Sequence, residues 1–462
     1  MNLTELYNKQ VAILGFGLEG RATLNYLLKH GIKPVLFDQR PWEEWSLKEQ
    51  SEIKSLNINF IFGPDAFKEL AGFDVVFRSP GIPLSKVVTN NKQLITSQTK
   101  FFFDNCPGKI IGVTGTKGKG TTTSLIYKIL QAQSKIGNRK SKIYLTGNIG
   151  KTQALEIIDD LKPDDWVVYE LSSFQLQDLT KSPHIGVVLM VTSEHLDYHK
   201  NLEEYIEAKS SIVKYQKQSD FAIVNADFPS SVFIGQQGNG SKIFFSRQKE
   251  LESGIYIKDN EIFVKNVLGA SYQLPTNNYQ LKGAHNLENI EASIGACLAA
   301  GIKNSNVLQS AISEFKGLEH RLEFVLEKNG VKFYNDSFST TPETAVAAIN
   351  SFKEPLILIL GGSSKNSDFT ELGKTVKNAK NIKSIILVGE EAGRIKSAIT
   401  AEGNSFSGFL EGAKNMEQIF DQIKLSALAG DVVLLSPACA SFGMFKNYKD
   451  RGEQFKNLVT TY

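Results

Sequence analysis

The sequence predicts an α/β protein of three domains, each built around a largely parallel sheet. The chain has 462 residues, and domains average about 150 residues. Short apolar runs that end at glycine or polar residues recur along it, as at 11–14, 109–113 and 356–360. Continuous apolar strands are typical of parallel sheets covered on both faces, and stretches with helical patterning separate these runs, as a parallel sheet requires.

The first domain is predicted over residues 1–104. A strand at 11–14 leads through glycines into a helical pattern at 21–28, and further strands are expected at 34–37 and 75–77. The pattern is interrupted at Asp104–Gly108, where proline and glycine favour a boundary.

The second domain is predicted over 105–317. Its strands are expected at 109–113, 166–169, 186–191 and 221–224, with helices at 124–130, 202–213 and 286–300. Short alternating runs at 243–245, 255–257 and 262–264 indicate a small β insertion within 235–278. The third domain, 318–462, repeats the strand signal at 356–360, 385–388 and 432–435.

The composition is that of an ordinary globular protein, with 41% hydrophobic and 22% charged residues. Cys106, Cys297 and Cys439 are far apart and odd in number, which argues against a disulfide framework or a zinc site and favours a reducing, cytoplasmic location. A net charge of +3 gives no reason to expect nucleic acid. No secretion signal is recognisable, and no apolar stretch approaches the ~18 residues of a membrane span.

A glycine-rich loop follows the strand at 109–113 and precedes a helix. Its glycines let backbone N–H groups turn toward an anion, the helix N-terminus adds partial positive charge, and Lys119 can reach terminal phosphates. Such loops normally place Ser or Thr directly after the lysine to ligate Mg²⁺. Gly120 stands there, and Thr121 is the nearest hydroxyl. The nucleotide-binding candidates are Gly115, Thr116, Lys117, Gly118, Lys119, Gly120 and Thr121.

A second glycine cluster, Gly15–Gly20, follows the strand at 11–14, and Asp38 ends the next strand. Alone, this pattern suggests a dinucleotide site in which an acidic side chain binds a ribose. A lone GxGxxG motif is weak, and a nicotinamide oxidoreductase would leave the later phosphate loop unexplained.

The segment Thr114–Lys119 (TGTKGK) resembles the ATP-binding loop of the Mur ligase family. Other segments resemble that family's motifs in the same order: TGNIG at 146–150, ELSSFQL at 170–176, TSEHLD at 192–197, AK at 208–209, GAHNLEN at 283–289, HR at 320–321, NDS at 335–337 and SPACAS at 436–441. The resemblance implies a Rossmann-like N-terminal domain, a central P-loop ATPase-type domain with a small β insertion, and a C-terminal Rossmann-like α/β domain.

The GNIG, ELSSFQL and SPACAS elements resemble the D-glutamate-adding branch of the family. The resemblance implies ATP-dependent ligation of D-glutamate to UDP-N-acetylmuramoyl-L-alanine through an acyl phosphate, in cytoplasmic peptidoglycan precursor synthesis. It implies ATP and Mg²⁺, with Mn²⁺ as the alternative ion, and no membrane insertion. We expect a monomer.

The resemblance also implies roles for individual residues. Lys119, Lys209 and His195 would be catalytic, and Thr121, Glu170, His195 and a carbamylated Lys209 would hold magnesium. The nucleotide would further contact Asn286, Asn289, Arg321 and Asp336. The UDP-linked substrate would contact Gly17, Leu18, Glu19, Asp38, Ser79 and Asn148, with the Glu19 side chain turned away from the phosphates. The amino acid would contact Thr340, Lys365, Ser441 and Tyr448.

The chain departs from the expected patterns at several positions. Besides Gly120, Met190 replaces an asparagine, Glu194 an aspartate, and Phe338 a lysine. These departures keep a non-catalytic nucleotide-binding homologue open as an alternative. A sibling ligase with another acceptor, such as L-glutamate, is also open. A folylpolyglutamate synthase shares the central loop but lacks the UDP-binding first domain.

Overall fold

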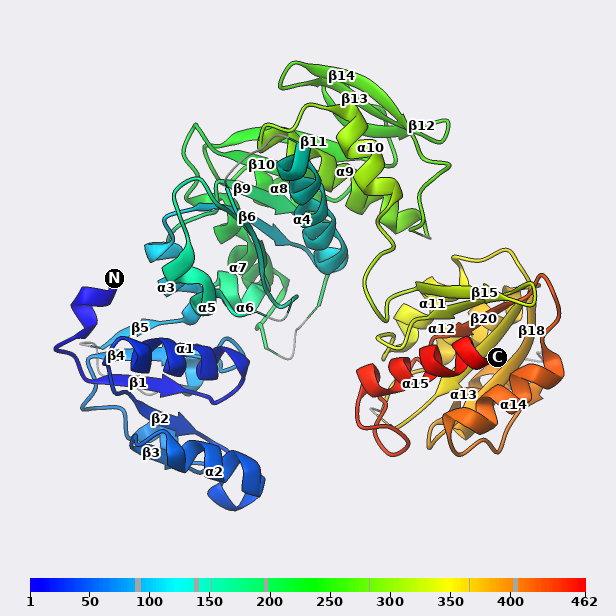
Figure 1. The fold of residues 1–462 in the computed structure, drawn as a ribbon, viewed down its shortest axis with the longest axis horizontal. Coiled ribbons are helices and arrows are strands. Elements are labelled where there is room, and N and C mark those ends of the chain that lie inside the picture. The colour runs from blue at the N-terminus through cyan, green and yellow to red at the C-terminus, as the bar shows by residue number, and fades with distance from the viewer. Residues whose placement is uncertain are drawn as a thin grey trace. The chain divides into compact units, whose positions relative to one another are not determined.

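The computed structural model describes residues 1–87, 93–136, 141–150, 152–194, 198–281, 283–364, 366–401 and 406–462 (Figure 1). Contacts divide the chain into two compact units. The first comprises Met1–Asn277 and Glu288–Ile312, and the second comprises Asn278–Leu287 and Ser313–Tyr462. Across these described ranges, no helix combines the length and the apolar character that crossing a membrane would need.

The first sheet has five parallel strands in the order β3-β2-β1-β4-β5. They are β1 (Val11–Leu14), β2 (Val35–Asp38), β3 (Phe60–Phe62), β4 (Val75–Arg78) and β5 (Leu94–Thr96). Its helices are α1 (Leu18–Lys29), α2 (Leu47–Ser55) and α3 (Gln98–Asn105), with 3-10 turns at Leu3–Leu6, Trp42–Glu44, Ala66–Lys68 and Leu84–Lys86. The strand order reverses between β1 and β4, and in such sheets ligands bind beyond the carboxyl ends of the strands at this reversal.

The second sheet has nine strands in the order β14-β13-β12-β11-β10-β9-β6-β8-β7. They are β6 (Lys109–Thr114), β7 (Ile143–Gly147), β8 (Trp166–Glu170), β9 (Ile185–Val188), β10 (Phe221–Asn225), β11 (Ser241–Ser246), β12 (Gly254–Lys258), β13 (Glu261–Val267) and β14 (Ala270–Pro275). The strands of the predicted β insertion are present, and they continue this sheet. Strand β12 pairs parallel with β11, and β13 pairs antiparallel with both β12 and β14.

Seven helices accompany this sheet among the described residues. They are α4 (Lys119–Ile136), α5 (Ala154–Ile157), α6 (Ser173–Leu176), α7 (Leu202–Lys214), α8 (Pro229–Gly235), α9 (Ala284–Ala299) and α10 (Ser305–Ser313), with a 3-10 turn at Ile158–Asp160. Helix α4 packs on β6, β7 and β8, and α7 packs on β6 and β9. The central strand β6 and the helix α4 therefore carry the phosphate loop between them.

The third sheet has six strands in the order β15-β16-β20-β17-β18-β19, and only β15 is antiparallel. They are β15 (Glu323–Lys328), β16 (Val331–Asn335), β17 (Leu356–Gly361), β18 (Ile382–Val388), β19 (Phe409–Leu410) and β20 (Val432–Leu435). The helices are α11 (Pro342–Ile349), α12 (Thr370–Asn378), α13 (Ala392–Thr400), α14 (Met416–Ser426) and α15 (Tyr448–Thr461).

The run at 356–360 is buried on both faces of this third sheet. Leu356, Leu358 and Leu360 belong to one apolar cluster, whereas Ile357 and Ile359 belong to another. Successive side chains of a strand point to opposite faces, so both faces are covered. The prediction made from the uninterrupted apolar run is confirmed.

Helix α3 joins the cores of the first two sheets. Phe101 contacts the rings of Tyr26 and Phe77, and Phe102 and Phe103 contact the ring of Tyr169 on β8. All three phenylalanines are fully buried. Burying such a side chain contributes roughly 1.5–3 kcal/mol, so the first two sheets share one continuous core.

Candidate functional site

The phosphate loop begins where β6 ends at Thr114 and closes where α4 begins at Lys119. Its backbone is fixed by the chain that follows β9. The Thr116 N–H donates to the carbonyl of Met190 (2.7 Å), and the Leu189 N–H donates to the carbonyl of Thr114 (3.0 Å). The loop therefore lies at the carboxyl end of the central strand, where parallel α/β sheets bind ligands.

Gly118 has a close neighbour on helix α9. A β-carbon at Gly118 would lie 2.2 Å from Asn289 Oδ1, and the backbone of Gly118 has φ +86°. Asn289 is buried and accepts a hydrogen bond from the Thr122 hydroxyl of α4 (3.2 Å). The structure thus brings Asn289, predicted to contact the nucleotide, against the phosphate loop.

Replacing Gly118 by alanine is expected to weaken ATP binding at least about tenfold. Alanine disfavours the left-handed region by roughly 1–2 kcal/mol, and its methyl group would displace Asn289. Calorimetric titration with a non-hydrolysable ATP analogue measures the affinity. Gly393→Ala is the matched control, because a β-carbon there meets no atom within 4 Å. An unchanged affinity in Gly118→Ala would contradict the role given to this glycine.

Two lysine amino groups meet at the phosphate loop. Lys119 Nζ lies 3.0 Å from the carbonyl oxygens of both Gly115 and Thr116. Lys209 Nζ, from α7, lies 3.1 Å from the same Gly115 oxygen and 3.2 Å from the Thr114 hydroxyl. From the sequence alone, Lys209 could be an exposed helix lysine or a functional one, and only the family resemblance favours the second. The structure places Lys209 at the loop with only 1% of its surface exposed.

The surroundings of Lys209 hold its pKa well below the usual lysine range. Burial is the largest cause, because it disfavours the charged form, and the neighbouring Lys119 charge acts in the same direction, while Glu194 opposes them. A neutral amine is nucleophilic, whereas an ammonium group is not. The lowered pKa of Lys209 therefore increases the fraction of its amine that is neutral.

Tyr205 is a site residue that sequence reasoning missed. Its hydroxyl lies 3.1 Å from the Thr116 hydroxyl, and Lys209 Nζ lies 4.6 Å from the centre of its ring. Burial raises the pKa of Tyr205 to about 12, so the phenol stays protonated. Its position four residues before Lys209 puts both side chains on one face of α7, and that spacing was the available signal.

Oxygen ligands suitable for Mg²⁺ lie around the same loop. Glu170 ends β8 directly beside Val113 of β6 and is buried, and Thr121 lies in the first turn of α4. Carboxylate and hydroxyl oxygens suit this hard cation, so the donor set fits the ion. Lys117 pairs with Glu194 (2.7 Å), and His195 lies outside the described residues.

The glycine cluster near the N-terminus forms a compact loop at the reversal of the first sheet. The Asp38 carboxylate accepts hydrogen bonds from the backbone N–H groups of Phe16 and Arg40 (both 2.9 Å), so it holds this loop in place. Arg40, which sequence reasoning missed, stacks on Trp45. The Ser79 hydroxyl donates to the Gly15 carbonyl (3.2 Å).

The remaining predicted UDP contacts differ in how far they are exposed. Gly17 and Leu18 are exposed, and Asn148 is exposed with its N–H on the Glu170 carbonyl (3.3 Å). The Glu19 carboxylate accepts a hydrogen bond from Gln175 of α6 (2.7 Å). Its side chain therefore turns toward the second sheet.

In the second unit, Asp336 is held at the end of β16. It accepts hydrogen bonds from the Ser436 hydroxyl (2.7 Å) and the Leu322 N–H (3.0 Å), and burial raises its pKa to about 7. The Arg321 guanidinium lies 3.9 Å from the centre of the Phe338 ring. Phe338, at the position where the family pattern has a lysine, thus packs against the arginine predicted to contact ATP.

The predicted amino-acid contacts lie on two paired loops and the start of α15. Ser363 bonds to the carbonyl of Ala440 (2.9 Å), which places the loop after β17 beside the loop that carries the buried Ser441. Tyr448 begins α15, and its ring lies 5.0 Å from that of Phe338. Thr340 is half-buried on the segment before α11. Lys365 lies outside the described residues.

Arg451, also missed by sequence reasoning, connects these loops. Its guanidinium is buried and donates to the Ser337 hydroxyl (3.0 Å), the Ser337 carbonyl (2.9 Å) and the Cys439 carbonyl (3.3 Å). Five N–H donors in a fixed plane allow this multiple contact. One side chain thereby links the segment with Asp336 to the segment with Ser441.

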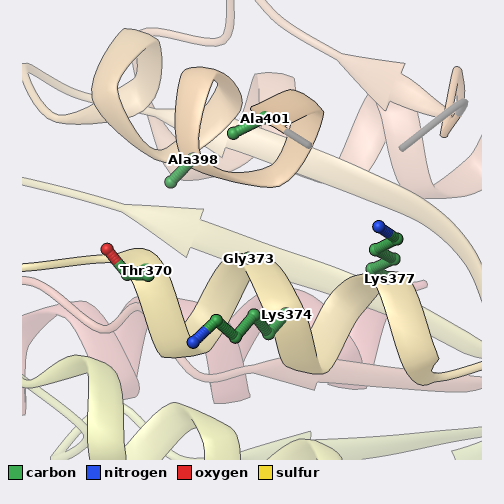
Figure 2. Close-up of a pocket in the computed structure, with 6 residues that line it drawn as sticks. All are labelled: Thr370, Gly373, Lys374, Lys377, Ala398 and Ala401. Atoms are coloured by element: carbon green, nitrogen blue, oxygen red, sulfur yellow. The ribbon is translucent and has the colours of Figure 1, made fainter. Parts of the chain in front are cut away.

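A separate hollow lies between α12 and α13 of the second unit (Figure 2). Its lining residues are Thr370, Gly373, Lys374, Lys377, Ala398 and Ala401. None of the residues predicted from the sequence lines it, and we assign no function to it.

Comparisons with known proteins agree with this arrangement. Three family models match: "Mur ligase MurD-like, N-terminal domain" at residues 9–95, "Mur ligase middle domain" at 113–297 and "Mur ligase, glutamate ligase domain" at 320–439. The solved MurF ligase from Thermotoga maritima in complex with ADP has a TM-score of 0.58 at 17% identity, covering 99% of this chain and 96% of that one. The fold class is confirmed.

Among curated proteins, the UDP-N-acetylmuramoylalanine--D-glutamate ligase of Acetivibrio thermocellus is 37% identical, over 99% of this chain and 97% of the relative. The enzyme of the same name from Clostridium tetani is 35% identical, over 98% and 97%. Full-length identity at this level, together with the matching models, establishes that the chain belongs to the Mur ligase family.

Proposed function

We propose that the protein is an ATP-dependent ligase that joins D-glutamate to UDP-N-acetylmuramoyl-L-alanine through an acyl phosphate. One observation carries the chemistry: the amino groups of Lys119 and Lys209 meet at a single carbonyl oxygen of the phosphate loop. The substrates are those in the names of the full-length relatives. With these substrates, the reaction belongs to peptidoglycan precursor synthesis, which takes place in the cytoplasm.

In the first step, the alanine carboxylate attacks the γ-phosphorus of ATP, and the bond to the ADP oxygen breaks. Phosphoryl transfer depends on positioning and on positive charge near the equatorial oxygens. Lys119 and the loop N–H groups supply both. In the second step, the D-glutamate amine attacks the acyl carbon, phosphate leaves, and the amine loses a proton as the amide forms.

Thr121, Glu170, His195 and a carbamylated Lys209 would hold Mg²⁺, which supplies charge neutralisation for the phosphates when bound. Carbamylation joins the neutral Lys209 amine to CO₂ with release of a proton, and its product is an anionic oxygen ligand. The depressed pKa of Lys209 supports this step, since it increases the share of the amine that is neutral.

Asn286, Asn289, Arg321 and Asp336 are proposed to contact the nucleotide, and Thr340, Lys365, Ser441 and Tyr448 the amino acid. The proposed domains are 1–104 for the UDP-linked substrate, 105–317 for ATP and 318–462 for the amino acid. Each of the three sheets is formed within one of these ranges.

Phosphate release from ATP tests the proposal directly. With Mg²⁺ and UDP-N-acetylmuramoyl-L-alanine, we expect release that requires D-glutamate, and a product heavier by one glutamyl residue. Release only with L-glutamate or another amino acid would keep the reaction and change the acceptor. Absence of release with every acceptor would favour the non-catalytic homologue.

A further inference from the structure

A buried polar cluster lies beneath the first turn of α1, between the first and second sheets. Glu19 Oε1 accepts a hydrogen bond from the side-chain amide of Gln175. Gln175 belongs to the ELSSFQL segment, which begins with Glu170. The Gln98 amide donates to the Glu19 carbonyl (2.8 Å), and Arg78 of β4 forms a buried ion pair with Asp178. Glu19 thus lies between the predicted diphosphate loop and the segment that carries Glu170.

Three polar atoms around this cluster have no hydrogen-bond partner among the described residues. They are Glu19 Oε2, Arg78 Nε and Gln98 Oε1, and each is buried. All three residues border one narrow gap, too small for a water molecule, together with Ser79 and Gly20. An ionised Glu19 can only accept hydrogen bonds, whereas a protonated one donates through its O–H. A proton on Glu19 would therefore add a donor to a cluster that also holds the acceptor Gln98 Oε1 and the donor Arg78 Nε.

The charged and titratable groups that act on Glu19 or respond to it are Arg78, Tyr169 and Asp178. The pKa of the Glu19 carboxyl is raised to about 7: burial is the largest cause, the Gln175 hydrogen bond and the Arg78 charge oppose it, and Asp178 acts in the same direction as burial. Tyr169 of β8 lies near enough for Glu19 to raise the pKa of its phenol. Near neutral pH, Glu19 is therefore divided between its charged and neutral forms.

We propose that Glu19 is a positioning residue that takes up a proton when the UDP-linked substrate binds. The neutral Glu19 side chain then keeps its contact with Gln175 beneath the substrate's diphosphate. The inference rests on the proposed function. Gly17 and Leu18 are exposed at the start of α1, and a β-carbon on Gly17 would meet no atom within 4 Å, so an anion has room there. A diphosphate beside a carboxylate disfavours its charged form, and the substrate would thereby hold Glu19 protonated.

The direction of the pH dependence follows from this linkage. Substrate binds more tightly to the protonated form, so affinity is greatest below pH 7 and falls as pH rises above the free-state pKa of Glu19. The fall is at most about tenfold per pH unit. The substrate's diphosphate diester stays ionised throughout, so it contributes no proton change of its own.

Calorimetric titration of the full-length protein with UDP-N-acetylmuramoyl-L-alanine, in buffers of different ionisation enthalpy, counts the protons taken up. At pH 7 we expect about half a proton per bound substrate, because a group with a pKa of about 7 is half protonated there. In Glu19→Gln, whose amide oxygen still accepts from Gln175, we expect almost no uptake and an affinity that no longer falls between pH 7 and 9.

Glu291→Gln is the matched control. Glu291 is a fully buried glutamate whose carboxyl has no hydrogen-bond partner among the described residues, and its pKa is also raised. It lies on α9 outside the Glu19 cluster, so its variant should keep the wild-type proton uptake. Uptake that persists in Glu19→Gln, or that disappears equally in Glu291→Gln, would overturn the inference. A wild-type protein that does not bind this substrate at any pH would instead overturn the proposed function.

Discussion

Lys119→Ala is expected to lower kcat for D-glutamate-dependent phosphate release by about 10²–10³-fold. Removing one preorganised group that stabilises developing charge typically has an effect of this size. Lys119 begins α4, and its amino group lies against the carbonyl oxygens of Gly115 and Thr116, within the loop predicted to surround the phosphates. Rates at saturating ATP, D-glutamate and UDP-linked substrate isolate the chemical effect from weaker binding.

Lys128→Ala is the control for this loss. Lys128 lies on the same helix nine residues later, about 13 Å along the axis, and should not affect kcat. A Lys119→Ala enzyme with a normal kcat and only a raised KM would show that the lysine binds ATP equally in the ground state and the transition state. That result would contradict the catalytic role.

The elements that the sequence predicted well carry strong local signals. The strand at 11–14 was predicted with its observed limits, and the helix at 202–213 ends one residue later in the structure, at Lys214. Strand β6, the glycine loop and α4 follow one another as the phosphate-binding pattern requires. In these segments the apolar runs, the glycines and the helix starts indicate the same structure, so local reasoning is sufficient.

Other strands were not identified because their local signals are weak. Strand β7 (Ile143–Gly147) contains a tyrosine and a threonine and is only partly buried. Strand β15 (Glu323–Lys328) has three apolar residues between charged ones at the sheet edge, and its register against β16 is irregular. Such strands form because a neighbouring strand offers hydrogen bonds, and that neighbour is distant in sequence.

The same limit applies to the candidate site. The motifs were sufficient to propose Lys119, Asn289 and Asp336 as nucleotide contacts. No motif indicated that Arg451 would link two loops that are more than a hundred residues apart in the sequence. Burial is likewise a property of the fold. It turns Glu19, an ordinary acid in a helix's first turn, into a group that titrates near neutrality.

Lys209→Ala is the second change for which we expect a large effect, about 10³-fold or more in kcat. If Lys209 is carbamylated, alanine removes an anionic metal ligand as well as an amine. Lys209→Arg should be as inactive, because a guanidinium keeps the charge and cannot form the carbamate. Lys214→Ala on the same helix, an exposed lysine paired with Glu207, should retain wild-type activity.

Added carboxylate distinguishes a carbamate from a plain amine at Lys209. Lys209→Ala leaves space beside Thr114 and Gly115, where acetate or formate can supply the missing anionic oxygen, and we expect either anion to restore part of the activity. An ammonium role predicts the opposite: ethylamine would restore activity and acetate would not. A ¹³C carbamate resonance in protein equilibrated with labelled bicarbonate, absent in Lys209→Arg, would identify the modified residue. Lys209 is buried, and its lowered pKa favours the neutral amine that the reaction with CO₂ requires.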